Sequence, residues 1–232
     1  MLVAGVQKLT LLDYPGQVAC TVFTGGCNFR CPFCHNASLV LPERMEKGGG
    51  AEATLDFLRK RQGILDGVCV TGGEPLLQEG LADFLRAVRA MGYKIKLDTN
   101  GSFPDRLRAL VEEGLVDRVA MDVKNSPDLY AKTVGLPLLD IAAVERSKNY
   151  LLEGCVGYEF RTTVVRGLHT AQSLTDAARW IAGAREYYLQ QYRDSGDLID
   201  AGGLDAFSDD EMRAFVERLR PIIPAVELRG VE

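Results

Sequence analysis

Apolar runs of strand length alternate with segments of helical periodicity along most of this chain. The runs expected to form strands are Gln17–Phe23, Gly67–Thr71, Tyr93–Leu97, Arg118–Val123, Tyr158–Val165 and Glu186–Gln191. Strands that alternate with helices in this way are typical of βα units, which build a parallel sheet. About six such units fit, too few for a closed barrel of eight strands. We therefore expect a single α/β domain over residues 1–232, an open partial (β/α)6 barrel with parallel strands and outer helices.

The segments between these strands carry apolar residues three or four positions apart, which marks one face of a helix. These faces comprise Leu81, Phe84, Leu85 and Val88; Leu107, Leu110 and Val111; Val144, Tyr150 and Leu151; and Leu174, Ala177, Ala178 and Ile181. Near the end of the chain, Ser208 followed by Glu211 is the pattern of a capping box and predicts a further helix. The segment LTLLDYPG at residues 9–16 is expected to form a hairpin at the edge of the sheet.

The net charge of −5 and the pI near 5.2 argue against a nucleic-acid partner, because no surplus of positive charge is available to neutralise phosphates. The N-terminal segment lacks the basic region and apolar core of a signal peptide. No apolar run approaches the roughly 20 residues of a membrane span. Three of the six cysteines lie within eight residues, which in a cytosolic protein indicates metal binding or catalysis rather than disulfides. We therefore expect a cytoplasmic protein that binds neither nucleic acid nor membranes.

Cys27, Cys31 and Cys34 offer three thiolates in a C-x₃-C-x₂-C spacing. A closed structural metal site usually has four ligands, whereas a catalytic one keeps a position open. His35 directly follows Cys34 and is too close to complete the set comfortably. A cubane iron–sulfur cluster held by three cysteines fits this pattern, because one iron then remains free for a substrate or cofactor. The remaining cysteines lie in apolar strand runs and are expected to be small buried hydrophobes: Cys20, Cys69 and Cys155.

Polar motifs stand at the expected carboxyl ends of successive strands. The cysteine group follows the first strand, and the next three strands end in TGGEP at 71–75, DTNG at 98–101 and MDVK at 121–124. In parallel barrels these loops share one face, which is where active sites are built. The four motifs therefore predict a single site.

The cysteine spacing, with Phe33 before the last cysteine, resembles the signature of radical S-adenosylmethionine (SAM) enzymes. The GGE at 72–74 resembles the methionine-binding motif of that superfamily. In order, LTLLDYPG, CPFCHN, TGGEP, DTNG and MDVK resemble the activating enzymes of glycyl-radical proteins. Within that group the chain is similar to the anaerobic ribonucleoside-triphosphate reductase activating proteins, a branch related to pyruvate formate-lyase activating enzymes. The resemblance implies the partial barrel of radical SAM proteins.

The resemblance also implies roles for individual residues. SAM would chelate the one iron of a [4Fe–4S] cluster that lacks a protein ligand. The three cluster ligands would be Cys27, Cys31 and Cys34. Phe33 and the backbone at His35 would lie against the adenine. Gly72 and Gly73 have no Cβ atom and would let the chain approach SAM closely, with Glu74 beside the methionine amino group.

Four positions match residues that hold a monovalent cation beside the SAM carboxylate in pyruvate formate-lyase activases: Asp98, Thr99, Met121 and Asp122. Lys124 would pair with the same carboxylate as a point charge. On the later strands, Arg161, Val164 and Gln191 would contact the adenosine. The family often has a histidine near the last of these positions, so QQY at 190–192 departs from its pattern.

Ordinary structural roles remain open for several of these residues. The GGE sequence can form a simple tight turn, and DTNG can form an Asx turn. Asp122 and Lys124 can be a solvated charge pair, and Arg161 can belong to a structural ion pair. His169, in the loop GLHTAQ, is expected at the surface, and Trp180 is expected to pack against its neighbours.

The resemblance implies a radical SAM oxidoreductase that reductively cleaves SAM at the cluster to give a 5′-deoxyadenosyl radical. That radical would abstract a Cα hydrogen from a glycine of a partner glycyl-radical enzyme, with a flavodoxin- or ferredoxin-type protein as electron donor. One alternative is a radical SAM enzyme acting on a small molecule, such as a 7-carboxy-7-deazaguanine synthase. Another is a non-catalytic metal-binding module, which would leave GGEP and DTNG without a role.

Overall fold

The strands form one continuous eight-stranded sheet in the order β1 to β8. The fold is that of a computed structural model, which describes residues 1–45, 48–194, 196–200 and 202–230. The first two strands pair antiparallel, and every later pair is parallel. The strands are β1 (Val3–Thr10), β2 (Ala19–Thr24), β3 (Gly67–Gly72), β4 (Lys94–Thr99), β5 (Arg118–Asp122), β6 (Gly157–Val164), β7 (Tyr187–Gln191) and β8 (Val226–Arg229).

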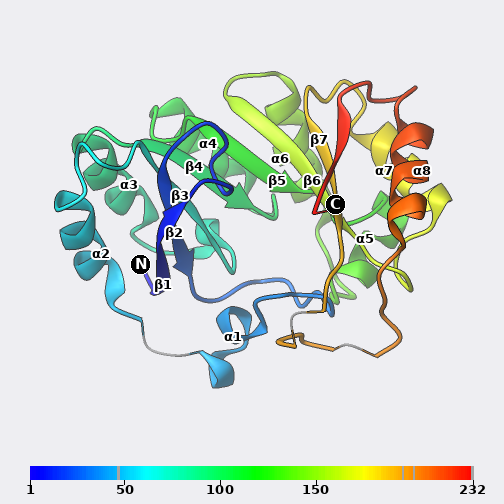
Figure 1. The fold of residues 1–232 in the computed structure, drawn as a ribbon, viewed down its shortest axis with the longest axis horizontal. Helices are drawn as coiled ribbons and strands as arrows, with labels where there is room; N and C mark the ends of the chain where they lie inside the picture. Colours follow the sequence, from blue (N-terminus) through cyan, green and yellow to red (C-terminus); the bar gives the residue numbers. More distant parts are fainter. Residues whose placement is uncertain (46–47, 195, 201, 231–232) are drawn as a thin grey trace.

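The six strands expected from the apolar runs are confirmed as β2 to β7, and β1 with β2 confirms the expected edge hairpin. The short strand β8 was not predicted. It adds a seventh parallel strand, so the sheet extends beyond six βα units. The sheet is curved (Figure 1), and because β1 and β8 remain its two unpaired edges, the barrel is open, as expected.

Helices α2 to α8 cover the outer face of the curved sheet, while the short α1 lies beyond its carboxyl end (Figure 1). They are α1 (Ala37–Val40), α2 (Gly50–Arg59), α3 (Leu81–Ala90), α4 (Pro104–Glu112), α5 (Pro127–Thr133), α6 (Ile141–Leu152), α7 (Ala171–Trp180) and α8 (Asp209–Leu219). In α3 the apolar positions named above are all buried, as helical periodicity requires. The predicted capping box opens α8, where Ser208 Oγ accepts from the Glu211 amide and Glu211 Oε2 accepts from the Ser208 amide.

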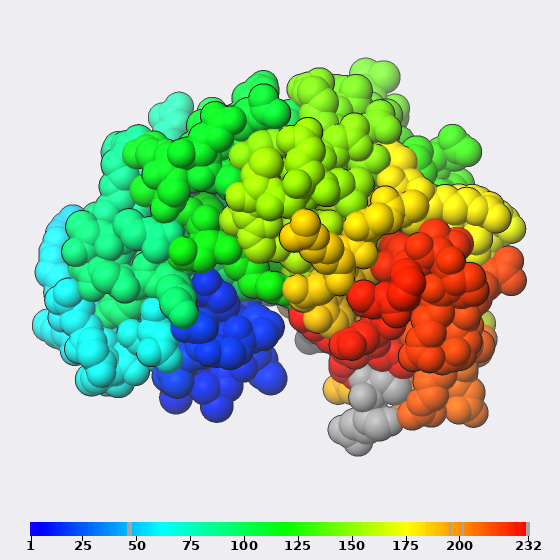
Figure 2. All heavy atoms as spheres, turned by 90° about the horizontal axis from the view of Figure 1, so that it is seen from above, coloured from blue at the N-terminus to red at the C-terminus, as the bar shows by residue number. Residues whose placement is uncertain are grey.

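Strand alternation separates an apolar outer face from a polar inner face. In β4, Ile95 and Leu97 are fully buried in the core, while Lys96 and Asp98 point to the opposite face. The inner face therefore carries charged side chains, in contrast to the branched apolar layers that usually fill a barrel. Figure 2, seen from above, shows a hollow between the blue β1–β2 hairpin and the red segment that contains α8 and β8.

Two sequence-based expectations about single residues are wrong. His169 is 3% exposed rather than at the surface, because its ring hydrogen-bonds the backbone of Val165 and Lys124. Cys155 is exposed in the turn before β6, whereas Cys20 and Cys69 are buried as expected. Trp180 packs edge-on against Tyr130, as expected. Across the helices of the described residues, none combines the length and apolar character needed to span a membrane.

Candidate active site

The loop that follows β2 carries the three clustered cysteines at the carboxyl end of the sheet. We call residues 25–36 the cluster loop. All three thiols are free, and the Phe29 amide lies 3.3 Å from Cys27 Sγ, to which it donates a hydrogen bond. Burial raises the pKa of Cys27 to about 11 and that of Cys31 to about 12. The metal-free thiols are therefore protonated near neutral pH, and binding of iron would displace their protons.

One cavity of about 370 Å³ opens at this end of the sheet. It is bounded by the cluster loop and by the ends of β3 to β7. The predicted site residues that line it are Cys27, Cys31, Phe33, Cys34, His35, Gly72, Gly73, Asp98, Thr99, Asp122, Lys124, Arg161 and Gln191. Glu74, Met121 and Val164 are fully buried beside it and are not among its lining residues. The structure thus gathers most of the predicted site at a single place.

Two glycines allow β3 to approach the cluster loop. A Cβ at Gly73 would lie 1.9 Å from the carbonyl oxygen of Gly26, and a Cβ at Gly72 would lie 2.4 Å from the backbone of Thr24. The close approach lets the amides of Gly73 and Glu74 donate to the carbonyls of Thr24 and Gly26 at 2.9 and 2.8 Å. Gly72 is therefore needed for packing of β3 against the end of β2, and Gly73 for packing against the cluster loop.

Glu74 joins the β3 loop to the β4 loop. Its carboxylate accepts hydrogen bonds from the Leu76 amide at 2.9 Å, the Thr99 hydroxyl at 2.8 Å and the Asn100 amide at 2.7 Å. Its side chain is fully buried, and this burial raises its pKa to about 7. The GGE sequence is thus more than a tight turn, because Glu74 fixes the position of the DTNG loop.

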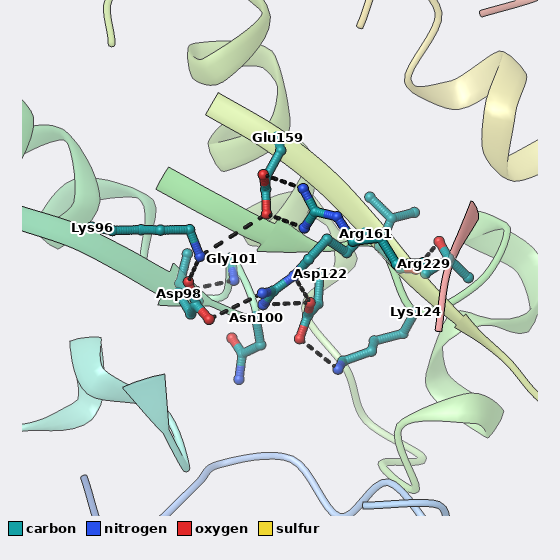
Figure 3. A network of polar contacts seen from close by, with 12 residues as sticks. Lys96, Asp98, Asn100, Gly101, Asp122, Lys124, Glu159, Arg161 and Arg229 are labelled. Atoms are coloured by element: carbon teal, nitrogen blue, oxygen red, sulfur yellow. Dashed lines mark hydrogen bonds and ion pairs between the residues drawn. The ribbon is translucent and has the colours of Figure 1, made fainter. Parts of the chain in front are cut away.

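Charged side chains alternate in sign across the floor of the cavity (Figure 3). Arg161 donates to Asp98 Oδ2 at 3.0 Å and to Asp122 Oδ1 at 3.1 Å. Lys124 donates to the other oxygen, Asp122 Oδ2, at 2.8 Å. Burial alone raises the pKa of Asp122, but the charges of Lys124 and Arg161 lower it to about 2. The pair of Asp122 and Lys124 is therefore half-buried within a larger network rather than a solvated surface pair.

Aromatic rings line the side of the cavity next to the cysteines. Lys124 Nζ lies 5.9 Å from the centre of the buried Phe33 ring, and the His35 ring packs edge-on against Tyr192 at 5.6 Å. Gln191 also lines the cavity, but its amide donates to the Phe207 carbonyl and to Asp209 Oδ1. Because the amide of Gln191 is held in this way, it is less available to a ligand than the sequence alone suggests.

Several residues of the site were missed by the sequence analysis. Asn100 donates to Asn28 Oδ1 at 2.9 Å and lies 3.8 Å from Cys27 Sγ, and its place in DTNG was the available signal. Asp197, in the segment after β7, reaches helix α1 directly behind the cluster loop, where its carboxylate accepts from the Ser38 amide at 3.0 Å. Nearby, Ile199 lines the cavity. No local pattern marks these last two residues, since their partners lie far away in the sequence.

The donor set fits an iron–sulfur cluster better than a single ion. Among residues 1–45, 48–194, 196–200 and 202–230, no three Cys, His, Asp or Glu side chains converge closely enough to hold one metal ion. In a cubane cluster each thiolate binds a different iron, so its ligands need not converge on one point. This arrangement fits the structure, in which three free thiols line one cavity and the Phe29 amide donates to Cys27 Sγ.

Comparison with known proteins agrees with this geometry. The sequence profile of the radical SAM superfamily matches residues 21–156, which include all three cysteines and the motifs at the ends of β3, β4 and β5. The chain belongs to the radical SAM superfamily. The fold and the class of enzyme are therefore those expected from the sequence, and the cofactors of this family are a [4Fe–4S] cluster and SAM.

Two relatives of this chain are named activating enzymes. A protein of Methanocaldococcus jannaschii, provisionally named a glycyl-radical enzyme activating enzyme, is 31% identical over 199 residues, covering 82% of this chain and 80% of the relative. The pyruvate formate-lyase-activating enzyme of Listeria monocytogenes is 31% identical over 63% of this chain and 64% of its own length. The structure of Streptococcus suis SuiB bound to precursor peptide SuiA matches with a TM-score of 0.72 at 13% identity, over 90% of this chain and 48% of that chain. This last likeness supports the fold alone.

Proposed function

We propose that this radical SAM enzyme activates a glycyl-radical enzyme. The observation that carries the proposal is the similarity to named activating enzymes over most of the chain, combined with one cavity that joins the three cysteines to the ends of β3 to β7. When bound, a reduced cluster would supply one electron that cleaves SAM to methionine and a 5′-deoxyadenosyl radical, which would take a Cα hydrogen from a glycine of the partner and leave 5′-deoxyadenosine and a glycyl radical. Candidate partners are an anaerobic ribonucleotide reductase or a protein of the pyruvate formate-lyase type.

In this proposal the cluster loop supplies the ligands. Cys27, Cys31 and Cys34 would hold the cluster, and the iron without a protein ligand would be left for SAM. The contact between the Phe29 amide and Cys27 Sγ, at 3.3 Å, favours the thiolate form that iron requires. Asn100, 3.8 Å from the same sulfur, adds a second weak donor. These contacts come from two different loops, so they also fix the position of Cys27.

The remaining lining residues hold SAM. Lys124 attracts the carboxylate of SAM as a point charge, and Phe33 together with the backbone at His35 forms the adenine wall. Gly72 and Gly73 keep the strand end free of side chains. Glu74 acts from behind them by holding the loop that contains Thr99 and Asn100. Arg161 and Gln191 face the adenosine side of the cavity, although hydrogen bonds within the protein already engage both side chains.

A protein substrate suits the open edge of the barrel, because a glycine-bearing loop has to reach the cavity. The hollow between the β1–β2 hairpin and the segment of α8 and β8 offers room for such a loop (Figure 2). The electron donor in this scheme is a flavodoxin- or ferredoxin-type protein. All six cysteines are free thiols, which suits the reducing cytoplasm as the place of action.

The first test is anaerobic. The protein is reconstituted with iron and sulfide, reduced with dithionite and mixed with SAM, and 5′-deoxyadenosine is measured. The wild type and a Cys155→Ala control should release it, whereas Cys31→Ala should not. A glycine-loop peptide or a partner enzyme is then added, and electron paramagnetic resonance should detect a glycyl radical. If a pterin substrate, and no peptide or partner enzyme, consumed the radical, a small-molecule enzyme would replace the activase proposal.

A further inference from the structure

The charge network on the cavity floor continues below the cavity into the interior of the barrel. Asp98 Oδ1 accepts from Lys96 Nζ at 2.5 Å, and Lys96 Nζ lies 4.0 Å from Glu159 Oε1. Together with the contacts of Arg161, this gives an unbroken series of alternating charges (Figure 3). We call this series the ion chain. Its members, in order from the cavity, are Lys124, Asp122, Arg161, Asp98, Lys96 and Glu159.

The inner end of the ion chain is anchored firmly. Glu159 is fully buried, and its carboxylate accepts hydrogen bonds from Nη1 and Nη2 of Arg229, at 2.8 and 3.0 Å, and from Arg118 at 2.9 Å. Burial raises the pKa of Glu159, but the Arg229 hydrogen bonds and the Lys96 charge outweigh it and lower the pKa to about 2. Glu159 is therefore a fixed negative charge behind Lys96.

Lys96 and Glu159 lie behind the residues that line the cavity. The side chain of Lys96 is 2% exposed and that of Glu159 is 0% exposed, and neither residue lines the cavity. Breaking a buried ion pair costs far more than breaking a surface pair, because the remaining charge is left without a partner. A lysine in such a place is therefore held by its ion pairs, and the pair that links it to a residue lining the cavity is the one with Asp98.

Asp98 divides its two oxygens between two cations. Oδ1 faces Lys96 below the cavity, and Oδ2 faces Arg161 on the cavity floor. This division fixes the rotation of the carboxylate, so only one oxygen is offered to Arg161. Arg161 then has donors left for Asp122, and Asp122 keeps its second oxygen for Lys124. Without Lys96, both oxygens of Asp98 could turn to Arg161 and draw it away from Asp122.

We propose that Lys96 is a positioning residue for SAM, with Glu159 behind it, and that it acts through Asp98 on Arg161 and Lys124. This inference rests on the proposed function only in taking the cavity as the SAM site. It assigns a role to two side chains that never touch the cofactor. It also explains why a strand that faces the barrel interior carries a lysine where an apolar residue would be easier to bury.

The test measures the binding of SAM separately from its cleavage. SAM affinity is determined by equilibrium dialysis on the oxidised, cluster-loaded protein, where no turnover occurs. Lys96→Met should weaken SAM binding about tenfold, the size expected when one partner is removed from a coupled polar network. At saturating SAM, release of 5′-deoxyadenosine should stay within about threefold of the wild type, since no group that contacts the reacting atoms is changed.

Arg118→Met is the matched control. It also removes one cation from Glu159, but Arg229 still holds that carboxylate through two hydrogen bonds, and Lys96 is untouched. It should lower the thermal stability without changing the SAM affinity. If Lys96→Met does not fold, Glu159→Gln serves in its place and should weaken SAM binding in the same direction.

A double-mutant cycle with Asp98→Asn tests the route of the effect. If Lys96 acts through Asp98, the double variant should bind SAM no more weakly than Asp98→Asn alone. Unchanged affinity in Lys96→Met, equal weakening in Arg118→Met, or full additivity in the cycle would each overturn the proposal. A wild-type protein that cleaves no SAM would instead count against the proposed function, so the two failures are distinguishable.

Discussion

Glu74 accepts hydrogen bonds from two loops of the candidate site, through Leu76 on one side and Thr99 and Asn100 on the other. In Glu74→Gln, one carboxylate oxygen becomes an amide group that cannot accept a hydrogen bond, so at least one buried donor loses its partner. We expect a loss of about 2 kcal/mol in the free energy of unfolding at pH 8, measured by urea denaturation. The neighbouring, exposed Glu79→Gln should change stability little. Equal stability of the two variants would contradict the bridging role of Glu74.

His169 gives a pH-dependent prediction. Its Nδ1 accepts from the Val165 amide at 3.0 Å, so Nε2 carries the proton and donates to the Lys124 carbonyl at 2.8 Å. Burial lowers the pKa of His169 below its usual range, and the charge of Lys124 acts in the same direction. Since the unfolded chain takes up a proton near pH 6.5 and the folded one resists it, this stability is present above about pH 6.5 and is lost as the pH falls.

The matched variant is His169→Gln, which can accept and donate similar hydrogen bonds but does not titrate. Between pH 7.5 and 5.5, the wild type should lose more free energy of unfolding than the variant, by up to about 1.4 kcal/mol, because only the pH unit below 6.5 contributes within this range. Parallel curves for the two proteins across this pH range would show that His169 does not stay neutral in the fold.

Local spacing is the reason why so many site residues were predictable. Cys27, Cys31 and Cys34 lie within eight residues, and the other motifs each stand directly at a strand end. Lys96 was not predictable in the same way. A lysine that alternates with apolar residues in a strand normally points to water, and only the curvature of the whole sheet encloses this one. His169 is similar, because its partners Val165 and Lys124 belong to a loop geometry that no local pattern marks.

At the scale of elements, the contact between β3 and the cluster loop depends on the absence of a side chain at Gly73. Gly73→Ala would place a methyl group 1.9 Å from the Gly26 carbonyl oxygen, where backbone on both sides has to move. We expect a loss of about 3 kcal/mol in stability, as for overpacking, and impaired retention of the cluster. Gly5→Ala is the matched control, since a Cβ there meets nothing within 4 Å. Thermal unfolding and iron content should separate the two variants.

Elements that pair across long sequence distances explain what the sequence analysis missed. The strand β8 has four residues, of which only Val226 is fully buried, so it shows no periodicity that could predict it. The segment after β7 contacts α1, next to the cluster loop, through Asp197 and Ser38, which are 159 positions apart. Helices such as α3 were predictable because their apolar faces lie within ten residues. Contacts of this long range depend on the assembled sheet, which local patterns do not specify.

At the scale of the whole molecule, the ion pairs around Glu159 connect strands from β4 to β8. Arg229 of β8 crosses β7 to reach Glu159 of β6, a partner 70 positions earlier. Arg118 of β5 binds the same carboxylate, and Lys96 of β4 lies beside it. Strands from both halves of the chain therefore share one buried charge, which supports the proposal that residues 1–232 unfold as a single unit.

Arg229→Met tests this proposal because it removes the contact made by the last strand. The Glu159 carboxylate would lose the guanidinium group that donates two hydrogen bonds to it, while staying buried. We expect this to lower the free energy of unfolding by about 3 kcal/mol. Fluorescence of Trp180, the sole tryptophan, and far-ultraviolet circular dichroism of the whole chain should report the same lowered midpoint. Arg220→Met, which removes an exposed pair with Glu217, should shift neither midpoint by a measurable amount. Two separate transitions in Arg229→Met would mean that the chain divides into independent folding units, because the tryptophan would then report one part while the dichroism reported both.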